Sequence, residues 1–164
     1  MATLTTVKGA NVTLVEGEPV DQVAASVNYG NLRVMYDSYT VDTSDEFGTS
    51  GIVRLFKIPK GARLVDFEFS CPATGATGIF NIGWTASADL LPGTTTPVEA
   101  ADDNGIIALA DPGAAAVNRQ KMVSTVDGYM KLFAAEVEVQ ASCTEVTADA
   151  GTKTLEFLAI IAVD

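Results

Sequence analysis

The sequence predicts an all-β protein: an antiparallel β-sandwich, jelly-roll-like, with an extended N-terminal arm and at most one or two short helices. Apolar residues recur at every second position in runs from residue 31 onward, which is the period of a strand with one buried face. Turn-forming Gly, Pro, Asn and Asp residues interrupt these runs at short intervals, as in sandwiches and barrels. The apolar content of 48% supplies enough side chains for such a core.

The 164 residues are expected to form one sandwich domain preceded by an arm. The arm covers residues 1–30 and the sandwich covers residues 31–164. Within the arm, one short helix is predicted after Pro19, because proline suits the first helical turn. Its predicted apolar face has the spacing i, i+3, i+4 and i+7 and consists of Val20, Val23, Ala24 and Val27.

The strands of the predicted sandwich follow in order along the chain. A polar loop is expected at 42–51, and Pro59-Lys60-Gly61 is expected to form a turn in which glycine adopts positive φ. Residues 86–127 are the least regular part and are expected to be a surface excursion with a role, containing one edge strand at 106–110. The other predicted strands are 33–41, 52–58, 64–71, 78–85, 137–141 and 155–163.

The alternation also assigns side chains to the two faces of each strand. In the strand 78–85, Gly83 lies opposite the apolar face, where it would tolerate a close backbone neighbour. Asp66 and Glu68 share one face of their strand, and we interpret them as the solvated face of a sheet, not as a paired-carboxylate site. The side chains expected to face the core are Val65, Phe67, Phe69, Cys71, Phe80, Ile82, Trp84, Val137, Val139 and Ala141.

The last strand, 155–163, is apolar on both faces. One face is Leu155, Phe157, Ala159, Ile161 and Val163, and the other is Leu158, Ile160 and Ala162. A strand of this kind is expected to be central in its sheet or to be covered by another subunit.

The charge balance and the missing histidines exclude several classes of function. Ten Lys and Arg face 21 Asp and Glu, which gives a net charge of −11, so phosphates would repel the chain and no nucleic acid is expected as a partner. Histidine is absent, which removes histidine general bases, the nucleophile systems that depend on them and the commonest zinc ligand. The sequence therefore predicts a protein that is not an enzyme, with no catalytic residue, cofactor or metal.

Two features bear on the compartment. The N-terminal residues lack the basic region and apolar run of an export signal, and the longest apolar stretch, 157–163, is too short to span a bilayer. No membrane is therefore expected as a partner. Cys71 and Cys143 have no metal-ligand spacing, and we interpret them as buried thiols, with a disulfide between them as the alternative.

Three polar segments are candidates for ligand sites. Asp42, Asp45 and Glu46 form an acidic loop, but they lack the ligand spacing of a calcium loop, so a solvated loop is the preferred interpretation. Residues 102–105, Asp-Asp-Asn-Gly, are interpreted as a turn with glycine at positive φ. Residues 75–78 lack the lysine of a phosphate-binding loop.

The aromatic residues Tyr36, Tyr39 and Trp84 are the candidates for a sugar-binding platform. The alternation places Tyr36 and Trp84 on core-like faces, so we interpret them as core residues. A carbohydrate-binding module remains an alternative function, and exposure of all three rings in a row would favour it.

The arm is the predicted partner interface. Its scattered apolar residues are too few to form a core of their own, and they are expected to become ordered against a neighbouring subunit. An arm strand added to a neighbour's sheet edge would also supply backbone hydrogen bonds. The predicted interface residues are Leu4, Val7, Val12, Leu14 and Val15.

A resemblance to a known family rests on three segments and a closing hairpin. Residues 39–41, 52–64 and 78–84 resemble a pattern of tailed-bacteriophage structural proteins, in which a strand ends in a turn like Ile58-Pro59-Lys60-Gly61-Ala62 and a strand like Phe80-Asn81-Ile82-Gly83-Trp84 follows. The hairpin around 150–155 and the apolar last strand are similar to the C-termini of those proteins. The resemblance covers residues 30–90 and 135–164.

The resemblance implies a virion structural protein, made in the host cytoplasm, of the head decoration or auxiliary capsid type. Such a decoration (cement) protein would bind the outer surface of the expanded head and stabilise it. Its implied partners are the major capsid protein and further copies of itself, with a homotrimer favoured over a dimer. A structural β-domain of the tail, neck or fibre is the alternative within the same class.

Overall fold

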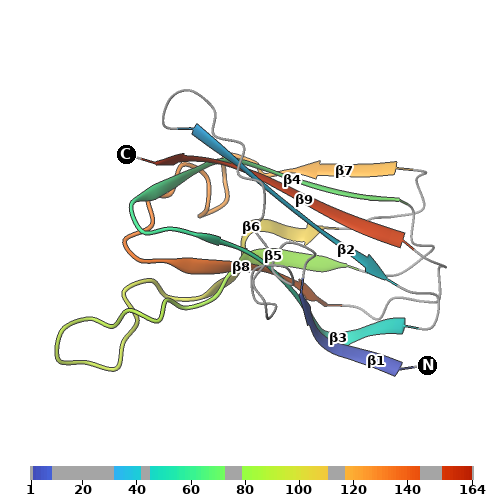
Figure 1. Ribbon diagram of the computed structural model, residues 1–164, viewed down its shortest axis with the longest axis horizontal. Coiled ribbons are helices and arrows are strands. Elements are labelled where there is room, and N and C mark those ends of the chain that lie inside the picture. The colour runs from blue at the N-terminus through green and yellow to red at the C-terminus, as the bar shows by residue number, and fades with distance from the viewer. Residues whose placement is uncertain are drawn as a thin grey trace, which may run out of the picture.

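The structure is a computed structural model that describes residues 2–8, 32–41, 45–72, 79–110, 117–144 and 153–163. These residues form nine strands and no helix, and the strands make two sheets packed face to face (Figure 1). The predicted β-sandwich is confirmed. The helix predicted after Pro19 lies outside the described residues.

Each sheet takes strands from several parts of the chain. The five-stranded sheet has the order β1 (Ala2–Lys8), β3 (Asp45–Ile58), β8 (Val137–Cys143), β5 (Phe80–Trp84) and β6 (Asp102–Ala110). The four-stranded sheet has the order β2 (Leu32–Val41), β9 (Lys153–Val163), β4 (Ala62–Pro72) and β7 (Val117–Lys121).

The described residues contain no helix that could cross a membrane.

The ladders between neighbouring strands are antiparallel except for one. β1 pairs with β3 in parallel, from Ala2 opposite Asp45 to Lys8 opposite Arg54. A parallel pair needs a long connection between its strands, and the chain from Lys8 to Asp45 supplies it, with β2 in the other sheet on the way.

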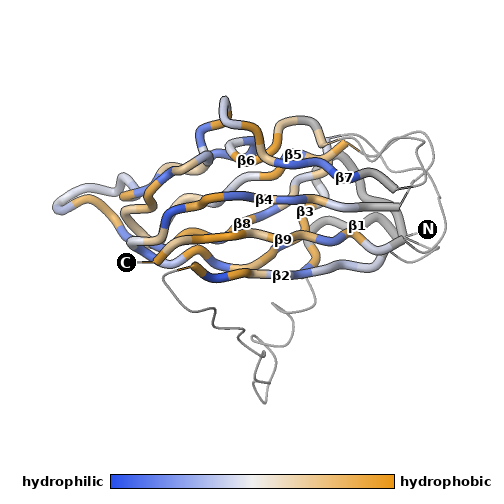
Figure 2. Tube along the Cα trace, turned by 90° about the horizontal axis from the view of Figure 1, so that it is seen from above, coloured by the Kyte–Doolittle hydropathy of each residue, from blue (hydrophilic) through white to orange (hydrophobic). Residues whose placement is uncertain are grey.

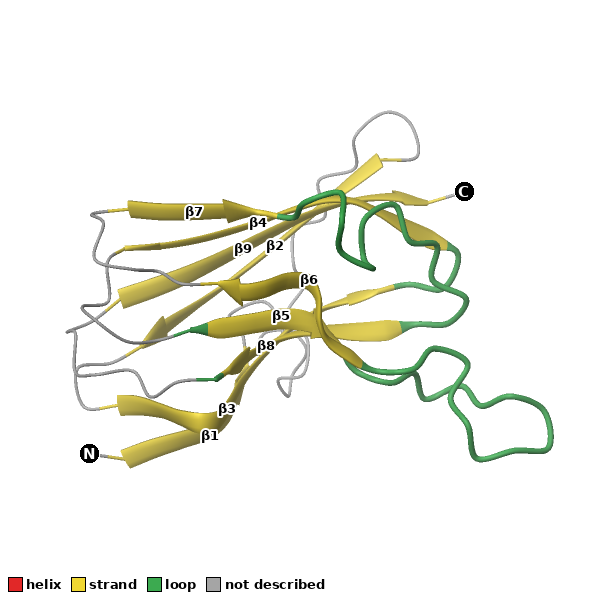
Figure 3. Ribbon diagram, turned by 180° about the vertical axis from the view of Figure 1, so that it is seen from behind, coloured by secondary structure: helices red, strands yellow, loops and turns green. Residues whose placement is uncertain are grey.

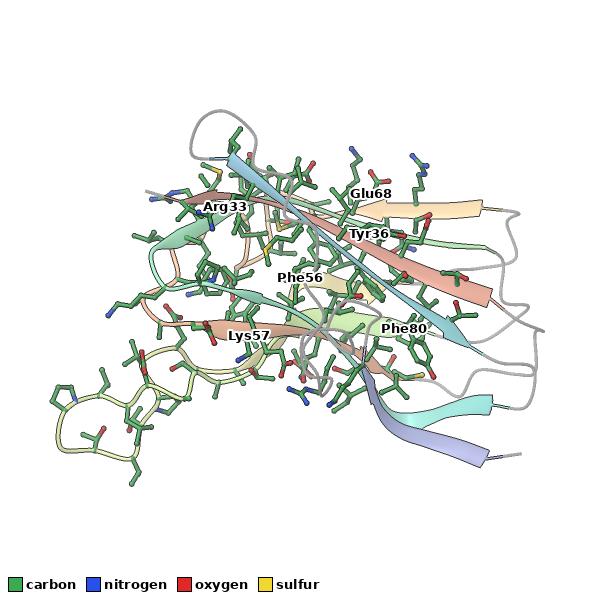
Figure 4. All side chains as sticks on the ribbon, viewed as in Figure 1. Arg33, Tyr36, Phe56, Lys57, Glu68 and Phe80 are labelled. Atoms are coloured by element: carbon green, nitrogen blue, oxygen red, sulfur yellow. The ribbon has the colours of Figure 1, made fainter. Side chains whose placement is uncertain are left out.

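The core lies between the two sheets. Phe69 on β4 packs against Phe157 on β9, with ring centroids 5.3 Å apart, and against Phe80 of the other sheet at 6.2 Å. Phe80 is labelled in Figure 4. Each fully buried side chain of this size contributes roughly 1.5–3 kcal/mol to folding. The burial of Phe67, Phe69, Phe80, Ile82, Trp84, Val137, Val139 and Ala141 confirms their predicted face.

A β-bulge changes the core side of β4. The pairing of β4 with β9 shifts register between Leu64 and Asp66. Because one extra residue reverses the alternation, Leu64 is fully buried and Val65 is half-buried. The prediction that Val65 faces the core together with Phe67 is therefore wrong by one position.

Two predicted turns have different outcomes. The turn at Pro59 is confirmed, because the Ala62 amide donates to the Pro59 carbonyl oxygen at 3.1 Å and Gly61 has φ of +80°. The turn predicted at 102–105 is wrong, because Asp102 begins β6. Gly105 is needed there for packing, since a Cβ atom at this position would overlap the Trp84 ring.

The prediction of a polar loop at 42–51 is wrong from Asp45 onward. β3 begins at Asp45, and its first residues pair with β1, which overrides the low strand propensity of a polar segment. The irregular segment predicted at 86–127 contains β6 and β7, which lie at the outer edges of the two sheets. The edge strand predicted at 106–110 is thus confirmed and extends back to Asp102.

Gly83 has the close backbone neighbour that was predicted for it. A Cβ atom there would overlap the Asp102 carbonyl oxygen of the adjacent strand β6. The central position of β9, between β2 and β4, is also as predicted for a strand that is apolar on both faces.

Candidate interaction surfaces

The outer face of the four-stranded sheet carries an exposed apolar surface. On β2, Leu32, Val34 and Tyr36 are 48%, 37% and 46% exposed. Their register partners on β9 are Ala162, Ile160 and Leu158, which are half-buried. Figure 2 looks onto this face, where β2 and β9 run side by side with hydrophobic residues along them. We call these six residues the outer strip: Leu32, Val34, Tyr36, Leu158, Ile160 and Ala162.

A charged border follows the outer strip on its β4 and β7 side. Glu68, opposite Leu158 in the ladder, lies 3.5 Å from Arg119 and 3.5 Å from Lys121 (Figure 4). These pairs are solvent-exposed on their basic side, so they contribute little to stability. A shallow hollow at this border is lined by Tyr36, Glu68, Ser70, Arg119, Glu156, Phe157 and Leu158.

Tyr36 joins the outer strip to this border. Its phenol donates a hydrogen bond to Glu156 Oε1 at 3.0 Å. Partial burial raises the pKa of the Tyr36 phenol above its ordinary value, and the Glu156 carboxylate raises it further because it stabilises the protonated form and repels the phenolate. Tyr36 therefore stays a neutral hydrogen-bond donor at physiological pH.

A second surface is a loop that projects from the five-stranded sheet beyond one end of the sandwich (Figures 1 and 3). This projecting loop, residues 85–101, connects β5 to β6. Its two sides are joined by the Val98 amide, which donates to the Asp89 carbonyl oxygen at 2.8 Å, and by the Ser87 amide, which donates to that of Glu99 at 2.9 Å. The loop is therefore an ordered hairpin-like extension.

The tip of the projecting loop, residues 90–97, is closed by a turn. The Thr94 amide donates to the Leu91 carbonyl oxygen at 3.0 Å, across Pro92 and Gly93. Gly93 has φ of +74°, and proline before it is the arrangement of a type II turn. Leu90 and Leu91 are 51% and 44% exposed at this tip.

The base of the projecting loop is fixed by a buried carboxylate. Glu99 is 8% exposed; its Oε1 accepts the Ala134 amide at 2.7 Å and its Oε2 lies 3.0 Å from Lys131 Nζ. Lys131 also lies over the rings of Trp84 and Phe133, 5.5 Å from each centroid. The Trp84 indole donates to the Ala100 carbonyl oxygen at 3.0 Å. These contacts hold the loop at a set direction relative to the core.

Of the predicted interface residues of the arm, the structure describes Leu4 and Val7. Leu4 and Val7 belong to β1, which pairs with the chain's own β3, and Val7 packs against the chain's own core. Val12, Leu14 and Val15 lie outside the described residues. Their contact with a partner remains a prediction.

The three aromatic residues that are candidates for a sugar-binding platform do not form a row. Trp84 is 2% exposed, as predicted, and Tyr39 packs against the core from the inner face of β2. Tyr36 is on the outer face, so its assignment to the core is wrong. The alternation of β2 is regular, but its buried face is that of Met35, Asp37 and Tyr39, which the sequence did not distinguish from the other.

The remaining candidate groups are placed as follows. Asp66 and Glu68 lie on the solvated face of β4, as predicted. Cys143 is buried, as predicted, while the side chain of Cys71 and residues 42–44 and 75–78 lie outside the described part. Within the described residues, no group of three or more Asp, Glu or Cys is placed to hold a metal ion.

The fold is similar to that of chains in phage capsid structures. One, from the "Capsid of Ralstonia phage GP4", aligns with a TM-score of 0.66 and 13% identity, over 97% of this chain and 98% of that chain. Another, from the "Cyanophage Pam1 capsid asymmetric unit", aligns with a TM-score of 0.60 and 14% identity, over 91% and 97%. No family model and no curated protein sequence matches the chain. At these identities the likeness establishes the shared fold.

Proposed function

We propose that this chain is a structural protein of a bacteriophage virion, and within the virion a capsid decoration (cement) protein on the outer surface of the expanded head. The observation that carries this proposal is the likeness to chains in two phage capsid structures. Both of those chains are covered almost completely, so the whole fold, and not an inserted part of a larger one, is what they share with this chain. The order of strands β2 to β9, four in each sheet, supports the jelly-roll-like prediction.

The charge of the chain supports a place on the exterior. With a net charge of −11, the protein would be repelled by packaged nucleic acid, whereas an outer surface imposes no such cost. The major capsid protein is the proposed partner, and neither nucleic acid nor a membrane takes part. The role is one of contact, so it needs no catalytic group and no cofactor.

The stabilisation follows from mass action. A protein that binds the expanded lattice and not the unexpanded one lowers the free energy of the expanded state by RT ln(1 + [L]/Kd) at each site. Because a head repeats the same site many times, weak contacts at single sites accumulate over the shell. A trimer would suit a three-fold position in such a lattice.

The test is co-sedimentation of the purified protein with expanded, undecorated heads of its phage, with unexpanded shells as the control. We expect saturable binding to expanded heads alone, at one copy or one trimer per lattice site. Absence of binding to both shells would overturn the decoration role. In that case, recovery of about a dozen copies per virion would assign the chain to the tail, neck or fibre.

A further inference from the structure

The shallow hollow at the border of the outer strip combines an exposed aromatic ring with polar groups. It crosses β9, with Tyr36 of β2 on one side and Glu68 of β4 on the other (Figure 4). Both residues are register partners of Leu158, so their backbones are two strand spacings apart, about 10 Å. The hollow has a volume of about 350 Å³, at the lower end of the range for small-molecule sites. It therefore has room for a ligand of about one ring.

The polar groups around the hollow keep hydrogen-bonding capacity for a ligand. Within the described part of the chain, the Ser70 hydroxyl and the Oε2 atom of Glu156 have no hydrogen-bond partner. Glu68 lies 3.5 Å from both Arg119 and Lys121, which is longer than the separation of about 2.7–2.9 Å in a strong charged hydrogen bond. The side chains of Arg119 and Lys121 are 70% and 64% exposed, so they are free to turn toward a ligand.

The charges at the hollow balance, and this selects the class of ligand. The carboxylates of Glu68 and Glu156 are matched by the cations of Arg119 and Lys121. A charged ligand would meet a like charge beside each opposite one, so it would gain little. An apolar ligand would remove water from these polar groups without replacing its hydrogen bonds. The ligand that fits is neutral and rich in hydroxyl groups.

We propose that this hollow binds one neutral sugar residue in its pyranose form. The C–H face of the sugar ring is apolar and would pack on the Tyr36 ring, which is 46% exposed. The sugar hydroxyls would donate to the carboxylates of Glu68 and Glu156 and accept from the Arg119 guanidinium. The hydrogen bond from Tyr36 to Glu156 at 3.0 Å orients the aromatic ring before the ligand arrives, which lowers the entropy lost on binding.

This site differs from the sugar platform considered in the sequence analysis. It uses Tyr36 alone, because Tyr39 and Trp84 pack in the core. The inference goes beyond the proposed capsid role and does not depend on it, since sugar binding is a property of the free protein. Binding to heads and binding to sugars are therefore tested separately.

The test is a titration of the isotope-labelled protein with the methyl glycosides of glucose, galactose, mannose and N-acetylglucosamine, followed by amide chemical shifts. We expect at least one glycoside to bind with a Kd on the order of 1 mM and to shift amides of β2, β4 and β9 around the hollow. Tyr36→Ala should weaken this binding at least about tenfold. The control Tyr129→Ala removes a ring that is 45% exposed and does not line the hollow, so it should bind like the wild type.

The proposal is overturned if no glycoside shifts these amides up to about 100 mM, if Tyr36→Ala binds like the wild type, or if Tyr129→Ala loses as much affinity. The methyl glycoside of glucuronic acid tests the charge argument, because its carboxylate should weaken binding relative to the glucoside. Equal or tighter binding of the glucuronide would overturn the assignment to neutral sugars. If Tyr36→Ala is unfolded, Arg119→Ala replaces it, and it should weaken binding at least about threefold.

Discussion

The two faces of β9 have nearly the same composition and entirely different surroundings. Phe157, Ala159 and Ile161 point into the sandwich and are at most 1% exposed, whereas Leu158, Ile160 and Ala162 point outward and are only half-buried. The inner face is covered by the five-stranded sheet. The comparison shows that the hydrophobicity of a strand predicts its burial but does not determine which of its faces is buried within the chain. The apolar face that remains exposed therefore indicates a contact with another molecule.

The largest effect is expected when the same residue type is truncated on each face. Ile161→Ala should lower the free energy of unfolding by about 2–5 kcal/mol, because it leaves a cavity between the sheets. Ile160→Ala should lower it by less than about 1 kcal/mol, because the outer face is open to water. Urea unfolding measures both, with the fluorescence of Trp84, the single and buried tryptophan, as the signal.

The adjacent isoleucines control for each other, since both substitutions remove the same methyl groups and the same strand propensity. The measurement is made at a concentration low enough for the monomer. Equal losses at the two positions would contradict the comparison and would mean that the outer face is buried in the monomer.

A smaller effect on the free energy of unfolding is expected from breaking a buried ion pair and an exposed one. Glu99→Ala should lower the free energy of unfolding by about 1–3 kcal/mol, because it leaves the Ala134 amide and Lys131 without their buried acceptor. Glu136→Ala breaks the ion pair with Lys57 at 3.1 Å, in which both side chains are more than half exposed. This substitution should change the free energy of unfolding by at most about 1 kcal/mol.

The same urea series tests this pair of variants. If the Glu136 variant lost as much stability as the Glu99 variant, the carboxylate at the base of the projecting loop would have no special role. Proteolysis supplies an independent readout, because release of the loop base should make residues 86–98 more susceptible in the Glu99 variant alone.

The alternation of apolar residues was enough to predict the sandwich and most of its core, because a period of two determines which side chains share a face. The prediction from alternation failed where backbone pairing shifted the register or extended a strand. The bulge between Leu64 and Asp66 exchanged the sides of Leu64 and Val65, and pairing with β1 turned the polar residues from Asp45 onward into a strand. Neither event has a signal in the local sequence.

The candidate surfaces were predictable to different degrees. The β9 half of the outer strip is predictable from the sequence, since Leu158, Ile160 and Ala162 form a second apolar face of their strand. The β2 half is not, because the alternation of that strand places Tyr36 on a core-like face. The projecting loop was recognised as an excursion with a role. The contact of Glu99 with Lys131 was not predictable, because only the folded chain brings together residues so far apart in a sequence without a motif.

The smallest effect is expected at the outer face, where Tyr36 donates to Glu156. The folded-state pKa of this phenol is raised, so its stabilising contribution is complete below the ordinary tyrosine pKa of about 10 and is lost as the pH rises through the folded-state value. The Tyr36→Phe variant lacks this contribution at every pH, so the difference in unfolding free energy between the two proteins should shrink above about pH 10. The difference in phenolate absorption between wild type and variant gives the titration of Tyr36 itself. A midpoint below the ordinary value would show that Glu156 does not stabilise the protonated phenol, and it would contradict the hydrogen bond between Tyr36 and Glu156 at the border of the outer strip.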